Sequence, residues 1–168
     1  MPIVVTLFNR YLMKHHGSTC DFNEQRDRCL LLAFRKVILK SDCIQLDCIA
    51  HTVVNMPAPR FWVSDKRAAI VVSSMLKGHN PTARMNGTKR DMYIEICRRT
   101  AALMQRSPQL SLAAAVGEVV CSPAPRFYLT PGTARILYYR AKSRWALPHL
   151  RQVVSKADMA ALYRKNNK

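Results

Sequence analysis

The sequence contains one eight-residue pattern in two copies, and this repeat limits what the chain can fold into. Residues 57–64 read Pro-Ala-Pro-Arg-Phe-Trp-Val-Ser, and residues 123–130 read Pro-Ala-Pro-Arg-Phe-Tyr-Leu-Thr, 66 positions later. The same offset of 66 aligns residues on both sides of the pattern without a gap, for example Ile70 with Ile136. A repeat of this length indicates two copies of one structural unit, so the unit has to be understood first.

Each copy is predicted to contain three helices. In the first copy, apolar residues recur at helical spacing over about 24–40, 46–54 and 65–77. In the second copy, the residues 66 positions later keep these apolar faces although many individual residues differ. The repeated periodicity therefore predicts two units of the same helical build.

Local signals mark where helices start and where the chain stays extended. N-caps are predicted at Ser64, Ser111 and Thr130, and Pro131 suits the first position of a helix. The Pro-Ala-Pro of each copy cannot continue a helix, so both segments are predicted to be extended. An alternative is that residues 61–63 and 127–129 pair with one another as short strands where the two copies meet.

The predicted fold is all-α, with two tandem three-helix lobes that resemble helix-turn-helix units in architecture. The predicted parts are an N-terminal segment (1–23), a first repeat (24–78), a basic linker (79–91), a second repeat (92–143) and a C-terminal helix with a basic tail (144–168). Nine residues separate Val54 from Ser64, more than a tight helix-turn-helix turn contains. The third helix of each lobe can therefore lie differently from the recognition helix of a helix-turn-helix unit.

The charge of the chain indicates a polyanionic partner. Lysine and arginine number 27 against 10 acidic residues, which gives a formal net charge of +17. Nucleic acid is the first expected partner and an anionic membrane surface the second. Residues 3–8 are apolar but too short for an export signal, and no window approaches the roughly 20 apolar residues of a membrane span. A cytoplasmic location is predicted.

The candidate nucleic-acid-binding residues lie in the repeated segments and on the outer faces of the third helices. They are Arg60, Lys66, Arg67, Lys77, Arg126, Arg135, Arg140 and Lys142. An arginine held on a proline-stiffened segment suits phosphate or guanine. The competing interpretation of Arg60 and Arg126 is structural: they bond helix-end carbonyls or stack on Trp62 or Tyr128. Phe61 and Phe127 are predicted to anchor the core.

The sequence proposes no catalytic residue, metal site or cofactor. It has no Gly-rich phosphate loop and no nucleophile elbow, and Cys43 and Cys48 do not form a CxxC pair. The predicted function is a non-enzymatic protein that binds double-stranded DNA, as a regulator or an accessory factor of a mobile element or phage. The alternatives are a packaging protein of a virion or nucleoid and an RNA-binding adapter. The oligomeric state stays open.

Overall fold

The computed structural model describes residues 19–41 and 45–144, and these residues are mainly helical. The helices are α2 (Thr19–Ile38), α3 (Leu46–Val54), α4 (Asp65–Leu76), α5 (Gly87–Arg106) and α6 (Leu112–Cys121), followed by helical residues 131–144. The all-α prediction is confirmed for this part of the chain. The predicted N-terminal segment up to residue 18 and the predicted C-terminal helix beyond residue 144 lie outside the described residues.

The helix starts follow the predicted side-chain caps. The Ser64 hydroxyl accepts from the backbone N–H of Arg67, and the Ser111 hydroxyl accepts from that of Ala114. In the second repeat the Thr130 hydroxyl accepts from the N–H of Thr133 at 3.2 Å. All three N-cap predictions are confirmed, and each cap satisfies a backbone donor that the first helical turn leaves without a partner.

The first helix of each repeat is longer than the apolar periodicity predicted. α2 begins at Thr19, and α5 begins at Gly87. The side chain of Asn86 caps α5 by accepting from the N–H of Lys89 at 2.9 Å. The predicted linker 79–91 therefore gives way to helix after Asn86, because this cap lets the helix start before its apolar face does.

The two Pro-Ala-Pro-Arg-Phe segments cross each other at their alanines. Ala58 and Ala124 form an antiparallel bridge, with N–H to oxygen distances of 3.0 and 2.9 Å. The Phe61 N–H donates to the Val120 oxygen, and 66 residues later the Phe127 N–H donates to the Val54 oxygen. These bonds are equivalent under the repeat, so the crossing has a local two-fold axis.

The crossing replaces the strand pairing considered from the sequence. The bridge joins the alanines of the two Pro-Ala-Pro segments and not the aromatic residues 61–63 and 127–129. Within residues 45–144 no longer β-ladder forms from this bridge. The flanking prolines explain its shortness, since they have no N–H to donate to a ladder.

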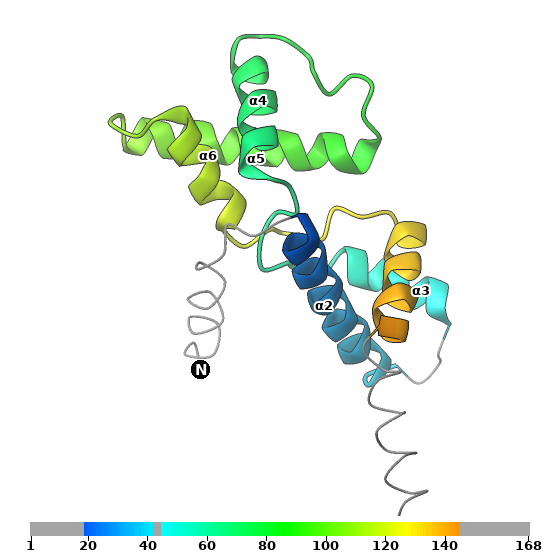
Figure 1. Cartoon of the computed structure of the whole chain (residues 1–168). Coiled ribbons are helices and arrows are strands. Elements are labelled where there is room, and N and C mark those ends of the chain that lie inside the picture. Colours follow the sequence, from blue (N-terminus) through cyan, green and yellow to red (C-terminus); the bar gives the residue numbers. More distant parts are fainter. Residues whose placement is uncertain (1–18, 42–44, 145–168) are drawn as a thin grey trace, which may run out of the picture.

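The crossing exchanges the third helices between the repeats. α4 packs on α5 and α6, which belong to the second repeat. The 131–144 helix reaches back to α2, where Tyr138 stacks on Phe34 at a ring distance of 4.3 Å. We call α2, α3 and the 131–144 helix the first bundle, and α4, α5 and α6 the second bundle (Figure 1). The sequence units 24–78 and 92–143 therefore differ from the units that pack together.

The length and stiffness of the connection account for the exchange. The nine residues between Val54 and Ser64 can span up to about 30 Å when extended. Two prolines in this stretch keep it from folding back as a tight turn. The third helix of each repeat consequently packs against helices of the other repeat and not against the helix that precedes it in the chain.

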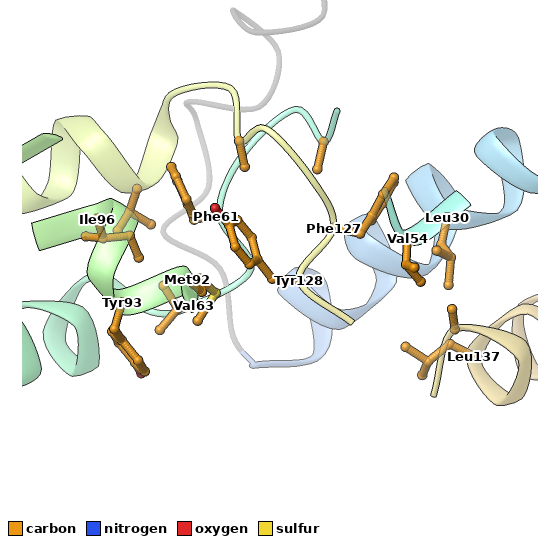
Figure 2. Packing of buried hydrophobic residues seen from close by; sticks show 14 of the residues in the cluster. Leu30, Val54, Phe61, Val63, Met92, Tyr93, Ile96, Phe127, Tyr128 and Leu137 are labelled. Atoms are coloured by element: carbon orange, nitrogen blue, oxygen red, sulfur yellow. The ribbon is translucent and has the colours of Figure 1, made fainter. Parts of the chain in front are cut away.

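The crossing segments also carry core residues. Phe61 is 0% exposed and Phe127 is 3% exposed, so both predictions of core anchors are confirmed. Figure 2 shows Phe127 on the side of Leu30 and Val54, and Phe61 on the side of Ile96. Each repeat thus inserts its phenylalanine among residues of the other repeat. One continuous hydrophobic core results.

Candidate nucleic-acid interface

The outer faces of the third helices carry six of the eight predicted contact residues. Lys66 and Arg67 begin this face in α4, and Lys77 caps its C-terminal end. Arg135, Arg140 and Lys142 lie on the 131–144 helix. All six side chains are exposed, because the apolar faces of these helices are turned into the bundles.

Two of these arginines also join helices within the first bundle. Arg140 contacts Asp27 of α2 at 3.0 Å, and Arg135 contacts Asp47 of α3 at 2.5 Å. Asp27 is only 1% exposed, whereas Asp47 is 77% exposed. Arg135 and Arg140 thus attach the 131–144 helix to α3 and α2. Both side chains are also exposed to solvent.

Arg60 and Arg126 sit against aromatic rings beside the crossing. The guanidinium of Arg60 lies 5.5 Å from the ring centre of Phe22 and 3.8 Å from Asp65. The guanidinium of Arg126 lies 4.9 Å from the ring centre of Tyr128, and it pairs with Asp91 at 2.6 Å. The stacking expected on Tyr128 is present, whereas Arg60 stacks on Phe22. Both arginines contribute to packing through cation–π contacts.

The two crossing segments differ at one backbone position. Tyr128 has a φ of 53°, in the left-handed region that residues other than glycine rarely adopt. Its ring stacks on Phe61 at 5.8 Å, which holds it in place opposite Arg126. Burial raises the pKa of the Tyr128 phenol, so this group remains neutral at physiological pH.

Arg99 is a residue that the sequence reasoning missed, and it braces the crossing. Its guanidinium donates to the Pro123 oxygen at 2.7 Å and lies 5.3 Å from the ring centre of Phe61. Glu95 holds Arg99 in place by accepting a hydrogen bond of 2.7 Å. The first repeat has Ala33 at the equivalent position, so comparison of the two copies gave no signal for this contact.

The Glu95 carboxylate makes stability depend on pH. Hydrogen bonds from Arg98, and then from Arg99, lower its pKa from 4.5 to about 2. Because the pKa is lower in the folded state, the stabilisation is present above about pH 4.5 and is lost as the pH falls towards 2. We expect Glu95→Gln to lower the unfolding free energy at pH 7 by no more than about 1 kcal/mol, since the carboxylate is partly solvated. This difference should shrink in urea unfolding at pH 3.

A suitable control for this measurement is Glu118→Gln. Glu118 is exposed and forms no ion pair within residues 45–144. Its replacement should leave the unfolding free energy at pH 7 close to that of the wild type, because exposed side chains without partners contribute little. If Glu95→Gln lowered the unfolding free energy by the same amount at pH 7 and at pH 3, the lowered pKa of Glu95 would be contradicted.

Four of the predicted contact residues have no acidic partner. Six acidic side chains of the described residues pair with arginines: Glu24, Asp27, Asp47, Asp65, Asp91 and Glu95. Lys66, Arg67, Lys77 and Lys142 form no ion pair within the described part of the chain. Their charges on the outer faces are therefore not neutralised by the acidic residues that the structure describes.

Further cations extend this surface beyond the end of α4. Arg84, Lys89 and Arg90 are exposed in the loop after α4 and in the first turn of α5. Arg90 donates to the Ala83 oxygen and lines an open hollow next to His79. From the sequence these cations were assigned to the basic linker 79–91 and were not predicted to contact a ligand. Their position relative to α4 depends on the tertiary structure.

The Cys29 thiol lies in α2 and is partly buried. Burial raises the pKa of the Cys29 thiol to about 11, which keeps it protonated and poorly nucleophilic. Among the described residues no group of three His, Cys, Asp or Glu side chains gathers as metal ligands would, and no helix is long and apolar enough to span a bilayer. Comparisons with protein-family models, curated proteins and solved structures found no match.

Proposed function

We propose that this protein binds double-stranded DNA without catalysing a reaction, through the outer faces of α4 and the 131–144 helix. The observation that carries the proposal is the set of exposed cations on these faces that have no acidic partner among residues 19–41 and 45–144: Lys66, Arg67, Lys77 and Lys142. A chain of net charge +17 that leaves such cations free favours a polyanion.

The symmetry of the crossing supports a duplex as that polyanion. The equivalent bonds made by Ala58 and Ala124 relate the two repeats by a local two-fold axis. Duplex DNA has two-fold axes of its own, so paired protein units can meet two half-sites about 34 Å apart on one face of it. Each bundle would present its exchanged third helix to one half-site, in the manner of a covalent dimer.

A titration against three nucleic acids tests the proposal. The protein is mixed with a random duplex, a single-stranded DNA and a double-stranded RNA at two salt concentrations. We expect the tightest binding to the DNA duplex, with affinity that falls steeply as salt increases. Preference for RNA would favour the adapter function. Failure to bind any duplex at low salt would overturn the proposal.

Replacing the four free cations links the binding to the proposed faces. We expect the variant Lys66→Ala/Arg67→Ala/Lys77→Ala/Lys142→Ala to reduce the slope of log affinity against log salt by about three to four units, since each phosphate contact adds about 0.9. The matched control removes four exposed cations outside the third helices: Arg35, Lys36, Lys40 and Arg106. An equal loss in both variants would assign the binding to overall charge and not to these faces.

A further inference from the structure

The third helices of the two repeats have kept an exposed apolar residue while diverging elsewhere. Residues 65–77 and 131–143 share the same residue at two aligned positions, Ala68 with Ala134 and Ile70 with Ile136. Both alanines are 0% exposed, so close packing explains their identity. Ile70 is 63% exposed and Ile136 is 67% exposed. Packing within the bundles does not explain why this isoleucine occurs in both copies.

The surroundings of the isoleucines restrict what could cover them. Lys66 and Arg67 precede Ile70 by one helical turn, and Lys77 follows it by two turns. Arg140 lies one turn after Ile136, and its side chain is half exposed although its guanidinium also contacts Asp27. A second copy of a chain with net charge +17 would be repelled from such a face. The fitting partner offers a small apolar group surrounded by negative charge.

The major groove of DNA offers this combination. Thymine is the one base that presents a methyl group there, and the phosphates of both strands line the groove. An isoleucine on a helix in the groove would meet the methyl group while neighbouring lysines and arginines meet the phosphates. Because apolar surface in water is unfavourable, the exposed isoleucines would gain free energy when such a contact buries them.

We propose that Ile70 and Ile136 contact thymine methyl groups, one in each half-site, so that the protein prefers duplexes with thymine at these positions. This inference rests on the proposed function. It assigns base preference to the one exposed position that the third helices share, and phosphate binding to the cations that vary around it. The two half-sites would then have thymine in common even where the rest of their sequence differs.

Replacing thymine by uracil tests this contact directly, because uracil lacks only the methyl group. The probes are two duplexes of about 30 base pairs, long enough for both half-sites. One alternates dA and dT, and the other has deoxyuridine in place of every dT. We expect the wild-type protein to bind the thymine duplex about tenfold more tightly, as expected for two methyl contacts.

The protein variants separate the methyl contact from other effects of uracil. The double variant Ile70→Ala/Ile136→Ala should bind both duplexes alike while its melting temperature stays unchanged, because both side chains are exposed. Ile94 is 49% exposed on α5, outside the third helices, and serves as the matched control. Ile94→Ala should keep the tenfold preference of the wild type.

The outcomes distinguish this inference from the proposed function. Equal wild-type affinity for the two duplexes would overturn the methyl contact while leaving duplex binding intact. A tenfold preference that survives in the Ile70→Ala/Ile136→Ala variant would also overturn it, since the preference would then come from DNA shape. Absence of binding to both duplexes at low salt would overturn the contact and the proposed function together.

Discussion

Replacing Val120 by aspartate is expected to unfold both bundles in one transition. Val120 is 0% exposed, and its backbone oxygen accepts the bond from Phe61 that closes the crossing. An unpaired buried carboxylate costs about 3–5 kcal/mol, a large part of the stability of a small protein. Each bundle takes its third helix from the other repeat. When the second bundle unfolds, α4 therefore loses its packing partners, and the hydrogen bonds of the crossing that also order the first bundle are lost.

Circular dichroism and calorimetry as a function of temperature check this result. The control is Ala113→Asp, which places an acid on an exposed position in the first turn of α6. The first repeat already has Asp47 at the equivalent position, and an acid there suits the helix dipole. We expect the control to melt as the wild type does. Two separate transitions in Val120→Asp, one at the wild-type temperature, would show that the bundles fold independently.

Replacing Asp27 by alanine is expected to lower the unfolding free energy by about 3 kcal/mol. The Asp27 carboxylate is 1% exposed and accepts from Arg26 at 2.9 Å and from Arg140 at 3.0 Å. Its removal leaves Arg26, with 17% of its side chain exposed, without a counter-charge. It also releases Arg140, which otherwise fixes the exchanged helix on α2.

Urea unfolding of a matched pair of variants measures this effect. Asp47→Ala removes the other aspartate that pairs with an arginine of the 131–144 helix, but Asp47 is 77% exposed. We expect its loss to cost less than about 1 kcal/mol, as solvated ion pairs usually do. Equal costs for Asp27→Ala and Asp47→Ala would contradict the role given to burial. Arg140→Ala combined with Asp27→Ala should cost less than the sum of the single changes, because the two residues interact.

The ion pairs also make the two bundles chemically different. Asp27 and Arg140 of the first bundle correspond to Tyr93 and Ser74 of the second, so no charge pair forms at the equivalent place. Tyr93 is instead buried, with 4% exposure. The repeat therefore preserves the backbone arrangement while the contacts between helices have diverged. Divergence of this kind favours one assignment of helices to bundles, since an aspartate next to Ser74 would lack its arginine.

Several elements of the fold followed from local physics. The apolar stripes identified the helices because a helix in a small protein has to bury one face. Ser64, Ser111 and Thr130 marked helix starts because their hydroxyls satisfy backbone donors within three residues. The start of α5 was missed by several residues, since Asn86 caps a turn that has no apolar face of its own. The prolines stopped the preceding helices, and a β-bridge forms in these described segments at Ala58 and Ala124 alone.

The candidate interface was predictable in part. The exposure of Lys66, Arg67 and Lys77 followed from the polar side of the helical pattern. The structural contacts of Arg60, Arg135 and Arg140 did not, because their partners are fixed by how the helices are assigned to bundles. Arg140 and Asp27 lie 113 residues apart in the sequence, and no local rule connects them.

The sequence by itself determined the repeat, most of the helices with three of their caps, the helix-breaking prolines and the excess of positive charge, since these depend on neighbours along the chain. Only the tertiary structure decided that the third helices are exchanged. The apolar faces of α4 and the 131–144 helix are both small and aliphatic near Ala68 and Ala134, so periodicity alone permits either pairing. The reach of the proline-stiffened connection and the reciprocal bonds at Ala58 and Ala124 select the exchanged one.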